Sequence, residues 1–258
     1  MPLPESNVLS TYDQIGSGYR LTRKEDPRVA SVIASELRSA GTVLNVGAGT
    51  GSYEPTDRFV VAVEPSDVML RQRPPEAAPA VQAIAERLPF GDDAFDAALA
   101  VLTVHHWSDQ HAGLKELSRV ARDRIVLLTW DPSNEGFWLV RDYFPAFLEA
   151  DRKRLPPVDR LLSFVEDAQV ITVPIPHDCA DGFLGAYWRR PWAYLNADIR
   201  KGISSFATCR DLSPLQRLAE DLDTGEWRRR YSDLLEADEL DIGYRLVVGR
   251  PSFGRKHL

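Results

Sequence analysis

The chain has 258 residues, of which 44% are hydrophobic and 27% charged, ordinary values for one globular domain with embellishments. Its net charge of −7 disfavours nucleic acid as a partner, because binding a long polyanion needs clustered Lys and Arg. No apolar stretch approaches the roughly twenty residues that cross a bilayer, so no membrane span is expected. The first residues lack a basic segment followed by an apolar one, and we therefore expect a cytoplasmic protein.

A helix is predicted from Asp26, a capping carboxylate before a proline, to about Gly41. Another is predicted over 109–121, with apolar residues on one face. Short apolar runs predict five strands, at 43–46, 59–63, 80–84, 95–102 and 124–129. Strands in such an alternation imply a parallel sheet built from right-handed crossovers.

The alternation changes after Asp131. Helical patterns cover 135–152 and 157–166, and two more strands are expected at 169–173 and 244–248. We therefore predict an α/β fold with a doubly wound, mostly parallel seven-stranded sheet. The aromatic-rich segment 174–240, between the last two strands, is predicted to form a helical lid. The basic groups at 152–154 and 228–230 are interpreted as solvated helix faces.

Glycines follow the first predicted strand, at Gly47, Gly49 and Gly51, and Glu64 ends the second. Glycine permits positive φ angles and exposes main-chain N–H groups to a ligand. A carboxylate at the end of the neighbouring strand can accept both hydroxyl protons of a ribose. Glycine turns also follow many buried strands for geometric reasons alone, but the acidic strand end favours a nucleoside site.

The turn suits a nucleoside without phosphates better than a dinucleotide. The third glycine of a dinucleotide motif falls at Ser52, and Pro55 stands where the phosphate-facing helix would already be running.

Metal binding is not expected. Cys179 and Cys209 offer neither zinc spacing nor a disulfide framework, and no carboxylate or cysteine completes a ligand set with the histidines near His106.

Three blocks, VLNVGAGTG at 43–51, VAVEPSDVML at 61–70 and AERLPFGDDAFDAAL at 85–99 followed by HHW at 105–107, resemble the class I S-adenosylmethionine-dependent methyltransferases. The similarity covers about 12–131 and is greatest to the ubiquinone/menaquinone-biosynthesis-like group, methyltransferase type 11. It implies S-adenosylmethionine as cofactor. The residues that it implies for cofactor binding are Gly47, Ala48 and Gly49 for the methionine moiety, Glu64 for the ribose, Pro65, Met69, Ala85 and Glu86 for the adenine, and Leu102.

This chain departs from the family pattern at two positions. Asn45 replaces the usual aspartate two residues before the first glycine, and Ile84 replaces a frequent acidic residue before Ala85. The adenine contact is therefore less well supported than the ribose contact. Met69 is suited to a purine face but is also typical of a helix core, and Glu86 is equally compatible with a solvent-facing position.

The leading segment YDQIGSGYRLTRKEDPR resembles the family segment that folds over the cofactor. Tyr19 and Arg23 are the candidates to cover the cofactor and pair with its carboxylate, and Arg20 is nearly as good as Arg23. We accordingly divide the single domain into a covering segment, a core, a lid, and a final strand with its tail. Their bounds are 1–25, 26–173, 174–240 and 241–258.

Acceptor binding and catalysis are predicted from two other segments. His106 is a candidate base and Trp107 a candidate acceptor contact, although a positional role for the histidine is open because many methyl transfers need no strong base. His177, Tyr187 and Trp188 are candidate acceptor-binding residues. The aromatic residues are alternatively the core of the helical lid.

We predict a methyltransferase that passes a methyl group from S-adenosylmethionine to O, N or C of a small molecule by in-line displacement. A nicotinamide-dependent oxidoreductase and a non-catalytic S-adenosylmethionine-binding protein are the alternatives. The residues carry no prediction of oligomeric state, and the acceptor is not identified by them.

Overall fold

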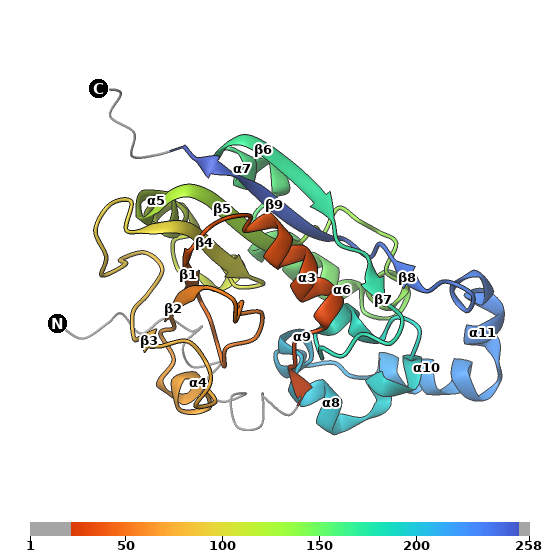
Figure 1. Cartoon of the computed structure of the whole chain (residues 1–258). Helices are drawn as coiled ribbons and strands as arrows, with labels where there is room; N and C mark the ends of the chain where they lie inside the picture. Colours follow the sequence, from red (N-terminus) through yellow and green to blue (C-terminus); the bar gives the residue numbers. More distant parts are fainter. Residues whose placement is uncertain (1–21, 253–258) are drawn as a thin grey trace.

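The computed structural model describes residues 22–252, and its centre is a seven-stranded sheet in the order β3-β2-β1-β4-β5-β9-β6 (Figure 1). The strands are β1 (Thr42–Val46), β2 (Phe59–Val63), β3 (Ala80–Val81), β4 (Phe95–Val101), β5 (Ala121–Trp130), β6 (Val165–Thr172) and β9 (Tyr244–Pro251). The first five pair in parallel, and β9 lies antiparallel between β5 and β6. The predicted mostly parallel seven-stranded sheet is confirmed. The strand order reverses between β1 and β4, where open α/β sheets form a ligand crevice.

Helices cover both faces of the sheet, which is why the central strands are apolar throughout. Helix α3 (Pro27–Glu36) contributes Ile33 to the cluster on one face, and Asp26 caps its first turn as predicted. Helix α5 (Gln110–Val120) contributes Leu117 to the cluster on the other face. Neighbouring residues of β1 alternate between the two clusters, Val43 on the α3 face and Leu44 on the α5 face.

Four predicted elements differ from the structure. Strand β3 is only two residues long. The helix predicted over 135–152 is divided into a π-helical turn, η2 (Leu139–Tyr143), and α6 (Pro145–Arg154), because Pro145 lacks the N–H that would continue the first helix. The helix predicted over 157–166 is only α7 (Val158–Leu162), and β6 begins at residue 165, earlier than predicted. The early part of this edge strand is largely exposed and therefore lacks a strong apolar pattern.

The segment 174–240, which we call the cap, lies between β6 and β9 and contains mostly short helices (Figure 1). Strands β7 (Ile175–Pro176) and β8 (Glu239–Leu240) pair antiparallel at its base. The helices are η3 (Leu184–Tyr187), η4 (Pro191–Leu195), α8 (Ala197–Lys201), α9 (Ser204–Ala207), α10 (Pro214–Asp223), α11 (Glu226–Arg230) and η5 (Ser232–Leu234). Helix α10 packs on η2, so the cap rests on the segment that follows β5.

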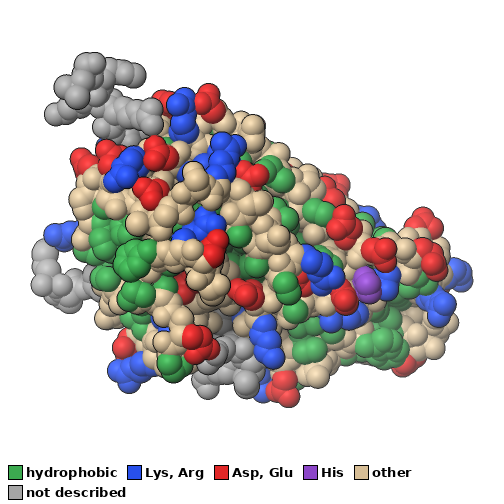
Figure 2. All heavy atoms as spheres, viewed as in Figure 1, with side chains coloured by type: hydrophobic (Ala, Val, Ile, Leu, Met, Phe, Trp, Pro, Cys, Tyr) green, Lys and Arg blue, Asp and Glu red, His purple; other side chains and the backbone are tan. Residues whose placement is uncertain are grey.

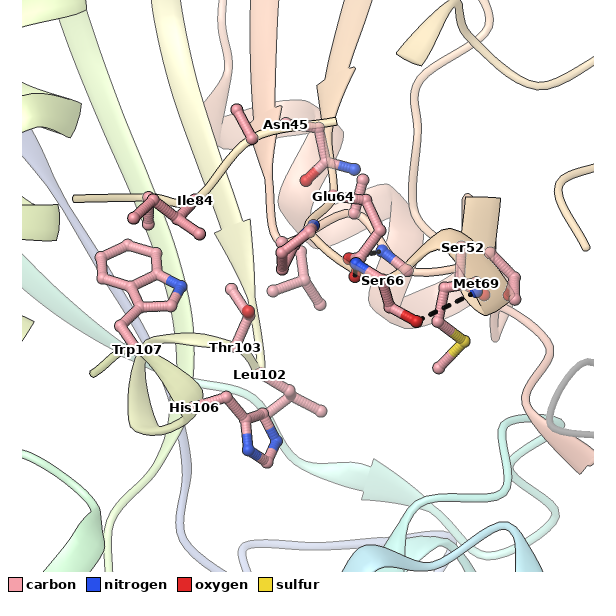
Figure 3. A pocket seen from close by; sticks show the side chains of 18 of the residues that line it. Asn45, Ser52, Glu64, Ser66, Met69, Ile84, Leu102, Thr103, His106 and Trp107 are labelled. Carbon is pink, nitrogen blue, oxygen red and sulfur yellow. Dashed lines mark hydrogen bonds between the residues drawn. The ribbon is translucent and has the colours of Figure 1, made fainter. Parts of the chain in front are cut away.

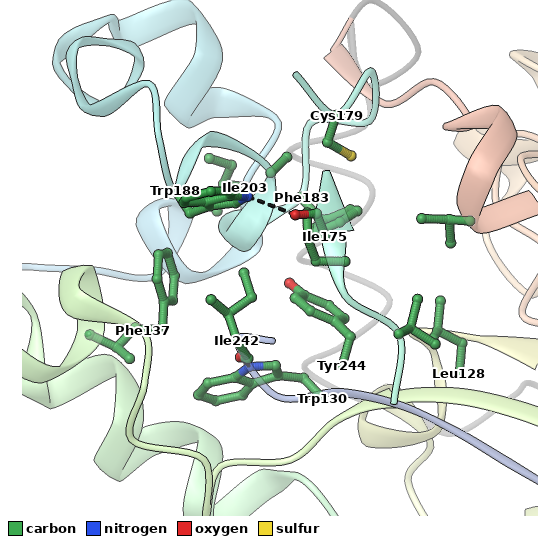
Figure 4. Close-up of a cluster of buried hydrophobic side chains, with 14 of the residues drawn as sticks. Leu128, Trp130, Phe137, Ile175, Cys179, Phe183, Trp188, Ile203, Ile242 and Tyr244 are labelled. Atoms are coloured by element: carbon green, nitrogen blue, oxygen red, sulfur yellow. Dashed lines mark hydrogen bonds between the residues drawn. The ribbon is translucent and has the colours of Figure 1, made fainter. Parts of the chain in front are cut away.

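Aromatic side chains form the interior of the cap. Trp138 is fully buried, and the rings of Tyr194, Trp227 and Tyr231 lie with their centroids 5.3–5.8 Å from its own. Trp188 is fully buried too, and its indole N–H donates to the carbonyl of Ile175 over 2.8 Å (Figure 4). These contacts match the geometry that aromatic pairs favour in protein cores.

Charged side chains of both signs are interspersed over the face of the molecule drawn in Figure 2. Many of them are paired at the surface, as Arg152 is with Glu135 and Arg71 with Asp67. Such exposed pairs contribute little to stability.

The described part of the chain contains no helix long and apolar enough to span a membrane.

Candidate functional site

A cavity opens at the carboxyl ends of β1, β2 and β4, where the strand order reverses (Figure 3). We call it the first cavity. Its wall includes the glycine turn after β1, in which Gly47, Gly49 and Gly51 all have positive φ angles, of 71°, 54° and 99°. A Cβ on Gly47 would lie 2.0 Å from the Thr103 hydroxyl, whereas a Cβ on Gly49 would meet nothing within 4 Å. The first glycine thus permits close packing, and the second leaves the main chain open to a ligand.

Glu64 follows β2 and directs its carboxylate at the glycine turn (Figure 3). One oxygen accepts from the N–H of Gly49 over 2.8 Å, and the other accepts from the N–H of Ser66 over 2.9 Å. The side chain is nearly buried yet lines the first cavity. Two main-chain donors therefore hold the carboxylate beside the turn, where the sequence predicts a ribose-binding group.

Asn45 belongs to a bonded network beneath the turn. Its amide N–H donates to Glu54 over 3.2 Å, and Glu54 is in turn paired with Arg73, which also donates to the carbonyl of Gly49. The Asn45 carbonyl oxygen is buried and has no hydrogen-bond partner among the described residues. An aspartate here would place a second carboxylate against Glu54, so the neutral amide fits this chain. Its spare oxygen at the cavity wall can accept from an ammonium group.

The opposite end of the first cavity is apolar. Pro65, Met69, Ile84 and Ala85 line it, and Trp107 lies beside Ile84 (Figure 3). Such side chains suit the face of a purine. The sequence predicts Trp107 as an acceptor contact. The structure instead places it among the residues that are predicted to contact the adenine.

Glu86, predicted at the adenine edge, lines the same cavity. One of its oxygens accepts from the Ser108 hydroxyl over 2.8 Å and from the Asp109 N–H over 3.0 Å. The carboxylate therefore orders the chain just before α5. Ala48 and Leu102 also lie in the cavity wall, as the predicted cofactor contacts require.

Arg23 connects the amino-terminal segment to the cap. Its guanidinium pairs with Asp181 through bonds of 2.7 and 3.3 Å, and the hydroxyl of Tyr53, at the end of the glycine turn, donates to the same carboxylate over 2.9 Å. Asp181 is buried. Tyr19 and Arg20 lie outside the described residues. Of the candidates in this segment, Arg23 is the one that the structure places at the cavity.

A second cavity adjoins the first, and Arg23, Leu102 and His106 line both. Its apolar wall comes from β5, β9, the cap and the chain around η2 and α6, and several of these side chains are drawn in Figure 4. They are Trp130, Phe137, Leu155, Phe183, Leu184, Ile203 and Tyr244. The polar groups are Asp151, Arg154, His105, Ser204 and Ser205.

The predicted acceptor residues of the cap do not line the second cavity. Trp188 is used in the cap core, and His177 bonds through its N–H to the carbonyl of Asp238, beside the β7–β8 pair. Tyr187 packs against Arg190 and Tyr194. The residues that line the cavity instead include Arg154, which the sequence predicts on a solvated helix face.

Two adjacent histidines lie where the two cavities meet, in η1 (Val104–His106). Burial lowers the pKa of His105 well below its usual value and lowers the pKa of His106 to about 3. The positive charge of Arg154 adds to both shifts. Both rings are therefore neutral at pH 7, and His106 has little tendency to hold a proton there. This favours the positional role over that of a strong base.

Asp151 and Arg154 face the second cavity from the end of α6. Their side chains are joined by a bond of 2.8 Å, and burial raises the pKa of the Asp151 carboxyl although Arg154 opposes the shift.

No cluster of three or more His, Cys, Asp or Glu side chains within 22–252 has the arrangement of a metal site.

The residues of the first cavity fit S-adenosylmethionine. The open main chain at Gly49 leaves room for a bulky ligand, the Asn45 oxygen and the Glu64 carboxylate are acceptors suited to an ammonium group and to ribose hydroxyls, and the apolar side chains suit the faces of a purine. The cavity has about 1220 Å³ of empty space, its open mouth included.

Known proteins share this architecture. A family profile described as "Methyltransferase domain" matches residues 44–128. A demethylmenaquinone methyltransferase of Mycolicibacterium paratuberculosis is 30% identical over 202 residues, which cover 70% of this chain and 85% of that protein. A rice chloroplast 2-methyl-6-phytyl-1,4-hydroquinone methyltransferase is 34% identical over 130 residues, or 45% of this chain and 37% of that protein.

A solved structure extends the similarity to the whole molecule. The crystal structure of a putative methyltransferase from an antibiotic biosynthesis pathway of Anabaena variabilis is 37% identical, with a TM-score of 0.79. The match covers 88% of this chain and 98% of that one. Because so little of this chain is left uncovered, the match reaches well into the segment after β5, beyond the family profile.

Proposed function

The chain belongs to the class I S-adenosylmethionine-dependent methyltransferases, and from this premise we propose that it methylates a small molecule at O, N or C, with the cofactor in the first cavity and the acceptor in the second. The observation that carries the proposal is the pair of adjoining cavities, one with a nucleoside-type wall and the other with an apolar wall. Their common residues, Arg23, Leu102 and His106, are assigned to the point of transfer.

When bound, the cofactor supplies a methyl group whose bond to the sulfonium breaks, leaving the electron pair on sulfur, while an in-line acceptor atom forms the new bond and releases its proton to solvent. The protein binds and orients. Glu64 is assigned to the ribose, Asn45 and the open Gly49 main chain to the methionine moiety, and Met69 to the adenine. Orientation of two reactants supplies much of the rate in such reactions.

A small-molecule acceptor agrees with the names of two relatives, which are methyltransferases of demethylmenaquinone and of a phytyl hydroquinone. The second cavity lies among β5, β9, α6 and the cap, and its largely apolar wall suits a small organic molecule. The cap thus acts as the lid, and the segment before Asp26 as the cofactor cover. We retain the cytoplasmic location and the absence of a nucleic-acid partner as predictions.

The similarity to methyltransferases favours transfer chemistry over nicotinamide chemistry, because no compared protein named above is an oxidoreductase. A non-catalytic cofactor-binding protein is distinguished by its products. Such a protein binds the cofactor but forms no S-adenosylhomocysteine with any acceptor offered.

Binding of S-adenosylhomocysteine to the Glu64→Ala variant tests the cofactor assignment. Loss of charged hydrogen bonds should weaken binding by about 1–3 kcal/mol in calorimetry. Asp67→Ala, which removes a nearby exposed carboxylate from α4 (Asp67–Arg71), should leave the affinity unchanged. Equal affinities for wild type and Glu64→Ala would exclude the ribose assignment. A thermal melt without ligand distinguishes lost contacts from lost structure.

A further inference from the structure

The two arginines of the second cavity differ in how fully they are bonded. Asp181 holds Arg23 through two bonds, and its own side chain is fully buried. Arg154 makes one side-chain hydrogen bond, from Nη2 to Asp151 over 2.8 Å, and its Nε is buried without a partner among the described residues. A guanidinium has five N–H donors. Arg154 therefore has spare donors, and about a third of its side chain remains exposed.

The charges around the second cavity favour a negative ligand. Two guanidinium groups and one carboxylate line the wall, but Arg23 is already neutralised by the buried Asp181, so the spare N–H donors are those of Arg154. The adjacent histidines His105 and His106 are neutral at pH 7. A cationic acceptor would have only Asp151, which already accepts from Arg154. An anionic oxygen would instead meet unused N–H donors, and guanidinium binds carboxylates and similar oxyanions in a planar, two-bond geometry.

The rest of the wall is apolar and rich in rings. Phe137 and Phe183 are almost fully buried, and so is Ile203 from the cap. Flat, apolar ligands lose the most water against such walls. A ligand that combines a ring or other apolar body with one acidic oxygen is thus complementary to the whole cavity.

We propose that the second cavity takes a compact, mainly apolar acceptor that carries one anionic oxygen, a carboxylate or an acidic phenol or enol, and that Arg154 binds this oxygen. Arg154 is then a specificity-determining residue at the α6 end of the cavity, while the atom to be methylated lies at the end formed by Leu102 and His106. This inference rests on the proposed function, because it assigns the ligand class of the acceptor site.

A pair of naphthyl probes tests the proposal on the full chain saturated with S-adenosylhomocysteine. The anion 2-naphthoate and the neutral 2-naphthamide share ring and size and differ in charge. Calorimetry should show naphthoate binding about tenfold or more tightly than naphthamide, because charge-assisted bonds exceed neutral ones. Arg154→Gln should abolish this preference and leave naphthamide within about twofold of wild type. Arg154→Lys should retain part of it.

Arg152→Gln is the matched control, since Arg152 lies on the same helix and pairs with Glu135 at the surface. It should retain the full preference. Ser204→Trp fills the cavity from the cap side and should abolish binding of both probes while S-adenosylhomocysteine still binds. Equal affinities of the two probes for wild type, a preference that survives in Arg154→Gln, or unchanged naphthoate binding to Ser204→Trp would each overturn the inference. Failure of wild type to bind S-adenosylhomocysteine would instead contradict the proposed function.

Discussion

The two cavities differ in the kind of groups that line them, although they share three residues. The polar part of the first is formed by main-chain groups of a glycine turn and by Glu64, all within a short stretch at the ends of neighbouring strands. The second is formed by side chains from β5, α6, the cap and β9, which are far apart in the sequence. The difference teaches that the reagent common to a family is recognised by backbone geometry, whereas its variable acceptor is recognised by distant side chains brought together by folding.

The strongest test of backbone control in the first cavity is Gly47→Ala. The new Cβ would meet the Thr103 side chain at 2.0 Å, and the residue would keep a φ angle of 71°. Strain and overpacking together should lower the free energy of unfolding by about 4 kcal/mol in urea titration. Gly49→Ala, with open space around its Cβ, should cost about 1 kcal/mol. Equal losses for the two variants would show that packing at Thr103 is unimportant.

The bond between cap and cofactor turn is tested by Asp181→Ala. Removing this buried carboxylate takes one partner from the Arg23 guanidinium and the acceptor from the Tyr53 hydroxyl. We expect the free energy of unfolding to fall by about 3 kcal/mol, measured by urea titration. Asp178→Ala, three residues earlier, removes an exposed pair with Arg28 and should cost less than about 1 kcal/mol. A loss at Asp181 as small as that at Asp178 would contradict a structural connection.

The neutral histidine where the cavities meet predicts a pH effect on stability. The pKa of His106 is about 3 in the folded protein, below its ordinary value of 6.5. Between these values the unfolded chain binds the extra proton, so the free energy of unfolding falls as the pH falls below 6.5. At pH 5 this contribution is at most about 2 kcal/mol.

His106→Gln should remove the part of the pH-dependent decrease in the free energy of unfolding that His106 causes. Urea titrations at pH 7 and pH 5 measure this decrease. His177→Gln, at the base of the cap, is the matched control, because His177 lies outside both cavity walls. An unchanged difference between the two pH values in His106→Gln would show that this ring is already protonated in the folded state near pH 5.

The smallest expected effect concerns the partner of Arg154. Asp151→Asn removes the carboxylate that competes for the Arg154 guanidinium. Binding of 2-naphthoate should strengthen about threefold, equivalent to ~0.6 kcal/mol, while 2-naphthamide binding stays the same. Calorimetry with S-adenosylhomocysteine present measures both. Weaker naphthoate binding would mean that Asp151 positions Arg154 rather than competing with the ligand.

The sequence predicts the fold and the first cavity well because their signals are local. The mostly parallel seven-stranded sheet follows from the alternation of apolar runs, and the positions of Gly47, Gly49 and Glu64 are set within twenty residues. The structure places Gly47, Gly49 and Glu64 beside one another, whereas their contacts with the cofactor remain predictions. The reason that Asn45 suits this chain better than an aspartate depends on the fold, because Glu54 becomes a neighbour of Asn45 only in the folded chain.

The second cavity could not be predicted in the same way. The aromatic residues near Trp188 look like a pocket in the sequence, but Trp188 itself is used to fill the interior of the cap. Arg154 looks like an exposed arginine because it lies in a basic triplet, and only the packing of α6 turns it toward the cavity. The spacing of Asp151 and Arg154, three apart on one helix, indicates a pair but not its burial.

The carboxylate of Asp181 belongs to the cap, yet its two partners, Arg23 and Tyr53, lie in the wall of the first cavity. A substitution that reshapes the cap for a new acceptor therefore also disturbs the grip on the methyl donor. We therefore expect changes in the cap near Asp181 to alter donor affinity as well as the acceptor site, because the same carboxylate bonds to Arg23 and Tyr53.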